Sequence, residues 1–301
     1  MCKVSVIIPT HNRVNLLKNA VNSVLNQTYK KFELLIVDDA STDDTINYIK
    51  NIKDNRINFI RNEISKGGSG ARNVGIKKAK GEYIAFLDDD DEWKKDKLQK
   101  QINLFKQDEE VGLVYTGAEI IYTNYKLKYK NLPSIKGNIS EKILIKNYIG
   151  TTSSVIVKRE ILDETGYFDE ELPALQDYDL WVRICQLTKI DCIEEPLINY
   201  YNRDNMTQIS DDTNKYKIAI RKMEAKYNNL IKKLNKINKN ERDLESFILL
   251  ANKAKRNNNS KLARYYLRSC LSKKIKLKFI ILFALTFFKF KYSVIFKSLL
   301  N

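Results

Sequence analysis

The chain has 301 residues, of which 43% are hydrophobic and 30% are charged, and its mean hydropathy is −0.43. This composition is too apolar for a disordered protein and too charged for a polytopic membrane protein. There is only one histidine, His11, and the four cysteines show no C-x-x-C spacing, so histidine-based metal sites and zinc ribbons are excluded. We expect a reduced, cytoplasmic protein whose chemistry depends on carboxylates.

The formal net charge of +16 is distributed unevenly along the chain. Residues 213–301 carry 23 Lys and Arg against four Asp and Glu, whereas residues 1–212 carry 30 against 33. This difference predicts a near-neutral globular domain over 1–212 and a basic helical region over 213–301. A basic region of this kind usually meets an anionic partner.

Strand and helix patterns alternate through the first 90 residues. Continuous apolar, β-branched runs predict buried strands over 4–8, 32–37, 57–60 and 83–87. Helical spacing predicts helices over 14–25 and over about 41–53, the second capped by Ser41-x-x-Asp44, and a glycine loop over 67–70 precedes a third helix that ends near residue 80. The alternation predicts an α/β fold with a doubly wound parallel sheet, in which ligands bind beyond the carboxyl ends of the strands.

Three polar clusters follow these predicted strands: residues 10–13, the pair Asp38 and Asp39, and four consecutive aspartates over 88–91. Adjacent carboxylates repel one another unless a cation neutralises them, and hard divalent cations prefer oxygen ligands. A solvated turn that caps a helix starting near Trp93 is the alternative interpretation. No G-x-G-x-x-G follows the first strand and no P-loop motif occurs, so both of these nucleotide-binding classes are excluded.

An apolar run over 279–288 lies between lysines, and no acidic residue follows Glu245. As a helix this run is about 15 Å long, roughly half the hydrocarbon thickness of a bilayer. We expect the segment over about 275–300 to lie on an anionic membrane surface. A last core helix packed on the body is the alternative, and nucleic acid is not an expected partner because the run is rich in bulky aliphatic side chains. The helices over 213–270 could also pair two chains in a homodimer.

Four motifs in order, VSVIIPTHNR, LNQTYKKFELLIVDDASTDDT, GGSGARNVGIKKAKGEYIAFLDDDDEW and LQDYDLWVRI, together cover about residues 3–205. This series resembles the family 2 glycosyltransferases, inverting enzymes of the GT-A fold that build bacterial cell-surface polysaccharides and other glycans. The resemblance implies a Rossmann-like nucleotide-sugar domain with a nucleotide-binding half over 1–110 and an acceptor-binding half over 111–212.

The resemblance also implies roles for individual residues. The nucleotide site would comprise Pro9, Thr10, Arg13, Asp38, Asp39, Arg72, Asp88 and Asp89. Mg²⁺ or Mn²⁺ would be bound by Asp90 and Asp88, and Asp177 would be the catalytic base, although Gln176 replaces the more frequent glutamate before it. Asp179, Trp181 and Arg183 are candidates for the acceptor side.

The implied reaction moves a sugar from a nucleotide-sugar, most often a UDP-sugar, to a hydroxyl of a glycan or lipid-linked acceptor with inversion at the anomeric carbon. Such an enzyme would act on the inner face of the cell membrane, to which the basic region would attach it peripherally. A non-catalytic relative that binds nucleotide-sugars or glycans, or a membrane scaffold, is the alternative. The presence of both Asp90 and Asp177 favours the enzyme.

Overall fold

The structure, a computed structural model, describes residues 3–203 and 212–300. The strands are β1 (Val4–Thr10), β2 (Phe32–Asp39), β3 (Ile57–Asn62), β4 (Tyr83–Phe86), β5 (Glu92–Trp93), β6 (Val111–Tyr122), β7 (Leu127–Asn131), β8 (Ile156–Lys158) and β9 (Lys189–Asn202). The α-helices are α1 (Val14–Leu25), α2 (Thr45–Lys50), α3 (Gly67–Lys78), α4 (Lys97–Phe105), α5 (Arg159–Thr165), α6 (Gln176–Leu187), α7 (Thr213–Lys226), α8 (Asn228–Lys233), α9 (Lys236–Arg256), α10 (Ser260–Lys273), α11 (Leu277–Leu285) and α12 (Phe290–Leu300). Three short 3₁₀ turns are η1 (Thr123–Tyr125), η2 (Lys142–Leu144) and η3 (Thr152–Ser154).

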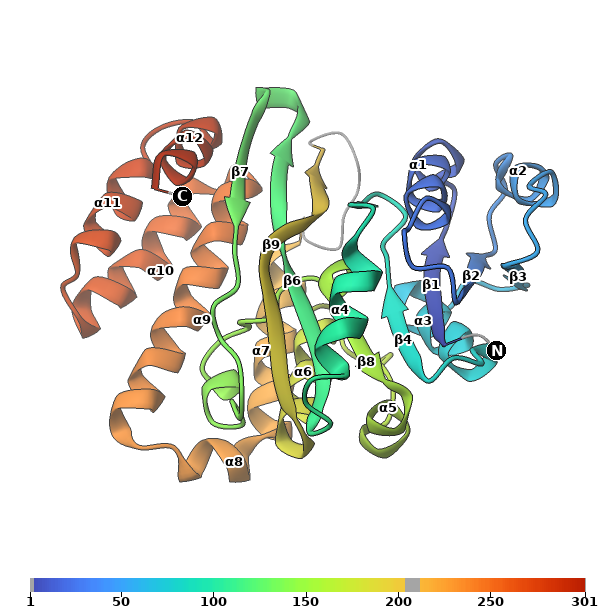
Figure 1. Cartoon of the computed structure of the whole chain (residues 1–301). Coiled ribbons are helices and arrows are strands. Elements are labelled where there is room, and N and C mark those ends of the chain that lie inside the picture. The colour runs from blue at the N-terminus through green and yellow to red at the C-terminus, as the bar shows by residue number, and fades with distance from the viewer. Residues whose placement is uncertain (1–2, 204–211, 301) are drawn as a thin grey trace.

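The strands form one sheet in the order β3-β2-β1-β4-β8-β6-β9-β5, with β7 paired to β6 (Figure 1). The first four strands along this order are parallel, as the alternation of strands and helices predicts. The sheet then becomes mixed, because β8 runs antiparallel to both β4 and β6, while β6 and β9 are parallel. The α/β fold class is therefore confirmed, and the doubly wound parallel pattern is limited to its first half.

Helices cover both faces of the sheet, which explains the continuous apolar runs in its strands. Neighbouring residues of β1 alternate between two hydrophobic clusters: Val6 packs with Leu17 and Val21 of α1, and Ile7 packs with Ala71 and Ile76 of α3. Because side chains of a strand point alternately to opposite faces, a strand buried on both sides must be apolar throughout.

Two local predictions differ from the structure. Ser41 and Asp44 do not cap α2, whose first residue is Thr45; Asp43 instead accepts hydrogen bonds from the backbone N–H of Thr45 and Val14, at 3.1 and 3.0 Å. The glycines over 67–70 do not form a loop, because they make the first turn of α3. Only Gly67 has a left-handed backbone there, with φ of +71°.

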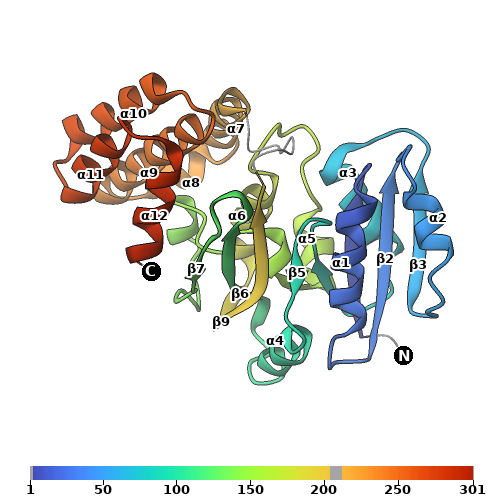
Figure 2. The same ribbon diagram turned by 90° about the horizontal axis from the view of Figure 1, so that it is seen from above.

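The described part of the basic region, residues 213–300, is packed on the sheet domain and not detached from it. Tyr216 and Ala219 of α7 share a hydrophobic cluster with Leu250 of α9, Leu267 of α10 and Leu172 of the sheet domain. Figure 2 shows α9, α10 and α11 stacked at the end of the molecule opposite to β3. The boundary expected at residue 212 adjoins residues 204–211, which lie outside the described residues.

The apolar run over 279–288 is interrupted between α11 and α12. The buried ammonium of Lys255 donates hydrogen bonds to the carbonyls of Thr286, at 3.2 Å, and Phe288, and these bonds satisfy two carbonyls of the turn between α11 and α12. Phe279 packs with Leu244 and Ile248 of α9 and Cys270 of α10, and Val294 is also buried. Among the described residues, no helix is both long and apolar enough to cross a bilayer.

Candidate active site

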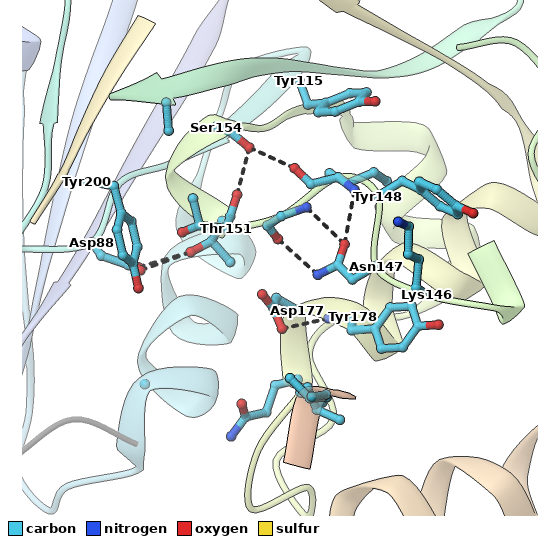
Figure 3. A pocket seen from close by; sticks show the side chains of 18 of the residues that line it. Asp88, Tyr115, Lys146, Asn147, Tyr148, Thr151, Ser154, Asp177, Tyr178 and Tyr200 are labelled. Atoms are coloured by element: carbon cyan, nitrogen blue, oxygen red, sulfur yellow. Dashed lines mark hydrogen bonds between the residues drawn. The ribbon is translucent and has the colours of Figure 1, made fainter. Parts of the chain in front are cut away.

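An open cavity of about 1130 Å³ lies beyond the carboxyl ends of β1, β2 and β4. We call the side built by these strand ends and the start of α3 the strand-end wall, and the side built by α7 and α9 the helical wall. Figure 3 shows Asp88 at one side of this pocket and Asp177 farther across, beside Tyr178, Tyr148 and Lys146. The cavity is lined by these residues expected at a site: Pro9, Thr10, Arg13, Asp39, Arg72, Asp88, Asp89, Asp90 and Asp177.

Asp39 organises the end of the cavity beside β2. Its carboxylate accepts hydrogen bonds from Ser65 Oγ at 2.6 Å, Asn62 Nδ2 at 2.7 Å and the backbone N–H of Lys66 and Gly67 at 2.9 Å each. Burial acts to raise the pKa of Asp39, but these hydrogen bonds outweigh it and the pKa is lowered. Asp39 is therefore a fixed anion that holds the turn before α3 in place.

Asp38 does not line the cavity. It is fully buried and forms an ion pair with Arg61, while its second oxygen accepts a hydrogen bond from the Ser41 N–H at 3.0 Å. Since successive side chains of a strand point to opposite faces, Asp38 and Asp39 cannot both face the same site. This position is a structural anion, and the structure does not bring it to the other residues expected to bind the nucleotide.

Asp89 connects the turn after β4 to the turn after β1. It accepts hydrogen bonds from Thr10 Oγ1 at 2.8 Å and from Arg13 Nη1 at 3.1 Å. Burial raises the pKa of Asp89 to about 6, and the charge of Arg13 limits the rise. Asp89 therefore positions Arg13 at the cavity, where the same guanidinium also pairs with Asp90 at 3.4 Å.

The other three aspartates converge. One carboxylate oxygen from each of Asp88, Asp90 and Asp91 lies within 4.8 Å of the others. Burial and mutual repulsion raise the pKa of both Asp90 and Asp91, a cost that a bound cation would offset. Three convergent carboxylates fit a hard divalent cation, so the residues present suit Mg²⁺ or Mn²⁺. The sequence predicted only Asp88 and Asp90 as metal ligands, and the structure places Asp91 beside them.

The alternative of a helix cap does not fit the aspartate run. Glu92 and Trp93 form β5, which pairs with β9, and α4 begins only at Lys97. The carboxylates therefore follow a strand and precede another strand, and no helix N-terminus accounts for them.

Arg72 of α3 contacts this acidic group through Asp88. Its guanidinium forms an ion pair with Asp88 and lies 5.5 Å from the centre of the Phe168 ring. A Cβ atom at position 68 would lie 3.1 Å from Arg72 Nη1, so a glycine there leaves room for the guanidinium. Arg72 thus lines the cavity wall, and its position beside a nucleotide stays a prediction.

Asp177 lies in the first turn of α6 and lines the cavity. The residue that starts this turn, Leu175, has a left-handed backbone with φ of +61°, a strained conformation for leucine. Burial raises the pKa of Asp177 to about 6, against the opposing effects of the Tyr178 N–H, which donates a 2.7 Å hydrogen bond, and of Arg72. A carboxylate with this pKa is well matched to accept a proton from a hydroxyl near neutral pH.

The three candidates for the acceptor side do not line the cavity. Asp179 is fully buried and is bonded to Arg183, Tyr227 and Lys226 at 2.6 to 2.9 Å. Trp181 is a core residue whose indole N–H donates to the Gly150 carbonyl at 3.2 Å. Arg183 also donates to the carbonyls of Thr165, Gly166 and Tyr167 at the end of α5. These residues hold α6 against its neighbours, and that is their observed role.

Sequence reasoning missed the helical wall. It is made of Tyr216, Ile220 and Met223 from α7, of Tyr227 between α7 and α8, and of Arg242, Glu245, Ser246, Ile248, Leu249, Asn252 and Lys253 from α9. Most of the α9 positions recur at three- and four-residue spacing, which marks one face of a helix. That spacing was visible in the sequence, but it does not say what the face is turned toward.

Comparison with known proteins identifies the family of this chain. A model of "Glycosyl transferase family 2" matches residues 5–166. Two Escherichia coli relatives are each described as a UDP-Glc:alpha-D-GlcNAc-diphosphoundecaprenol beta-1,3-glucosyltransferase. WfaP is 38% identical over 72% of this chain and 83% of its own length, and WfgD is 34% identical over 71% and 81%. The amylovoran biosynthesis glycosyltransferase AmsB of Erwinia amylovora is 35% identical over 65% and 69%.

Solved structures share the fold at low sequence identity. S. aureus TarS 1-349 in complex with UDP-GlcNAc matches with a TM-score of 0.58 at 18% identity, over 90% of this chain and 89% of that chain. The mannosyltransferase PcManGT from Pyrobaculum calidifontis, in complex with GDP-Man and Mn²⁺, matches with a TM-score of 0.56 at 18% identity, over 94% and 78%. At this identity the likeness concerns the fold alone.

Proposed function

The chain belongs to glycosyl transferase family 2 and is a glycosyltransferase of polysaccharide biosynthesis, and we propose that it transfers a sugar from a UDP-sugar to a hydroxyl of a lipid-linked glycan with inversion. The donor and acceptor classes are those in the names of WfaP and WfgD, of which this chain covers more than four-fifths. UDP-glucose and an N-acetylglucosaminyl diphospholipid are therefore the first substrates to test.

Asp177 acts as the general base in this proposal. It removes the proton of the acceptor hydroxyl, whose oxygen then forms a bond to the anomeric carbon of the donor sugar. The bond from that carbon to the diphosphate breaks on the opposite side, so the configuration is inverted. Positioned general bases of this kind contribute about 10²–10⁴-fold to the rate.

The strand-end wall holds the leaving nucleoside diphosphate. Arg13 and Arg72 provide positive charge at the cavity, and Asp39 fixes the turn of residues 65–67 that would border the base of the nucleotide. A divalent cation bound by Asp88, Asp90 and Asp91 would supply Lewis-acid stabilisation of the charge on the diphosphate.

One observation carries the proposal: a single cavity is lined by Asp177 and by Asp88 and Asp90, two of the three convergent aspartates. The test is calorimetric titration of UDP, GDP and dTDP with and without Mn²⁺, for the wild type and for Asp90→Ala. We expect Mn²⁺-dependent binding of UDP that the variant loses, followed by transfer of glucose from UDP-glucose to the N-acetylglucosaminyl diphospholipid. Absence of nucleotide binding by a folded wild type would contradict the proposal and favour a glycan-binding module or a membrane scaffold.

The proposal includes contact with an anionic membrane surface through α11 and α12. The exposed large apolar side chains of this segment and its approach are Ile275, Leu277, Ile280, Phe287, Phe288 and Tyr292. Six lysines at positions 273, 274, 276, 278, 289 and 291 accompany them. Apolar side chains mixed with lysine suit a membrane interface, where a lipid-linked acceptor would reside.

A further inference from the structure

The polar side chains of the helical wall include two that have no partner. Glu245 and Asn252 line the cavity, yet among the described residues neither side chain makes a hydrogen bond or an ion pair. Both are part-buried, so each gives up some hydration without a replacement in the protein. Unpaired polar groups in a cavity are available to a ligand.

The geometry of α9 places these groups in a row. Arg242, Glu245, Leu249 and Asn252 are separated by three, four and three residues, so they share one face of the helix along about 15 Å of its axis. Arg242 is fixed at one end by an ion pair with Glu224 of α7, at 3.0 Å. The face is therefore held in position and presents a carboxylate, an amide and an apolar side chain to the cavity.

This face lies close to the proposed base. Glu245 and Asn252 line the same cavity as Asp177, Tyr148 and Tyr178. Figure 3 shows the two tyrosines beside Asp177, on the side of the pocket away from Asp88. The Tyr178 ring is fixed by a 2.6 Å hydrogen bond from its hydroxyl to the Ile143 carbonyl. The proposed base, the two tyrosines and the unpaired groups of α9 thus line one cavity.

We propose that the inner face of α9 is the acceptor-sugar subsite, in which Glu245 and Asn252 bind hydroxyl or amide groups of the acceptor sugar and Tyr148 and Tyr178 pack against its ring. The inference rests on the proposed function, since it needs a donor on the strand-end wall. A carboxylate accepts hydrogen bonds from sugar hydroxyls, and a carboxamide both accepts and donates them. Glu245 and Asn252 are specificity-determining residues in this assignment, and they lie outside the half over 111–212 that was expected to bind the acceptor.

Two variants test the assignment. Glu245→Gln keeps the size of the side chain and removes its charge, and Asn252→Ala removes the amide. Transfer of glucose from UDP-glucose is measured against a series of diphospholipids that carry N-acetylglucosamine, N-acetylgalactosamine, glucose or galactose. We expect the KM for the best acceptor to rise about tenfold in each variant, as the loss of a hydrogen bond at a binding site predicts. The affinity for UDP and the slow hydrolysis of UDP-glucose without acceptor should stay within about twofold of the wild type.

Matched controls exclude a general effect of the substitutions. Asn240 lies on the exposed side of the same helix, and Glu141 is exposed beside η2; neither lines the cavity. Asn240→Ala and Glu141→Gln should leave the KM for the acceptor unchanged. Thermal unfolding of all four variants, followed by circular dichroism, shows whether each one is folded.

The outcomes separate this assignment from the proposed function. If the wild type binds no UDP, or transfers glucose to none of the acceptors, the proposed function fails and the subsite fails with it. If the wild type transfers glucose while folded Glu245→Gln and Asn252→Ala keep its acceptor KM, the subsite is wrong and the proposed function stands. A change in UDP affinity equal to the change in acceptor KM would also overturn the subsite, because the residues would then act on the donor.

Discussion

The two walls of the cavity differ in how their polar groups are used. On the strand-end wall nearly every charge is paired within the protein: Asp89 with Thr10 and Arg13, and Asp88 with Arg72. On the helical wall Glu245 and Asn252 have no such partners among the described residues. A nucleoside diphosphate has a constant shape and charge that a preorganised site can match, whereas uncommitted groups suit the more variable acceptor.

The largest effect expected is the loss of transfer when the base between the two walls is neutralised. Asp177→Asn keeps the shape of the side chain but cannot take a proton, so kcat should fall about 10²–10⁴-fold. The affinity for UDP should be retained, because the proposed nucleotide site lies on the strand-end wall. Rates of glucose transfer and calorimetric UDP titrations measure both effects. A variant with wild-type kcat would remove Asp177 from the mechanism and break the division between the walls.

The second effect is expected at Asp179, two residues after Asp177 on α6, where a substitution should lower the stability of the fold. It is fully buried and bonded to Arg183, Lys226 and Tyr227, so Asp179→Asn breaks a buried charge network between α6 and α7. Loss of one partner from a buried pair costs about 3–5 kcal/mol, which urea unfolding would detect. Unaltered stability of Asp179→Asn would show that the network is not needed to hold the helical wall in place.

Asp177→Asn provides the control for that measurement. The pKa of Asp177 is about 6 in the folded protein, above the ordinary value of 3.8, so the fold favours the protonated form. Ionisation therefore costs stability as the pH rises from about 4 through 6, and that cost is fully present at pH 7. A neutral amide removes it, so Asp177→Asn should be at least as stable as the wild type at neutral pH.

A third expected effect is the pH dependence of the chemical step. Because only the ionised Asp177 accepts a proton, kcat should fall about tenfold for each pH unit below about 6. The affinity for UDP measured over the same range separates this loss from protonation of Asp89, whose pKa is also about 6. A kcat that stays constant down to pH 5 would mean that another group limits the reaction.

The strand-end wall could be predicted because backbone topology alone determines it. Buried β-branched runs identified β1, β2 and β4, and parallel strands bring the residues after them to one edge. What the sequence could not give was the direction of individual side chains: Asp38 and Asp39 follow the same run, but only Asp39 faces the cavity. The pleat of β2 decides which of the two carboxylates faces the cavity. The pleat depends on the register of the strand, which the apolar run does not specify.

The helical wall could not be predicted because its placement depends on tertiary packing. The charge difference between residues 1–212 and 213–301 suggested an appendage, but the lysines are mainly on the surface, while Leu250 and Tyr216 pack against Leu172 of the sheet domain. Helical spacing marks a face on α9 without identifying its neighbour. Asp179, Trp181 and Arg183 show the same limit, since their helix was predicted but its buried side was not.

The smallest effect is expected at the outer side of the helical region, where α11 and α12 would meet the membrane. Phe287 and Phe288 are 66% and 57% exposed, and Phe287→Ser or Phe288→Ser removes an aromatic ring without disturbing the buried Phe279. Each variant should bind vesicles of anionic phospholipid about tenfold more weakly, the effect of losing a partly inserted ring.

Ile64→Ser, at an 80% exposed position after β3, is the matched control and should bind as the wild type does. Flotation of vesicles at low and high salt measures these affinities, and binding should weaken with salt because the lysines contribute. Equal loss in all three variants would mean that no particular face of the molecule binds the membrane, and the helical region would then contribute only its inner face to the reaction.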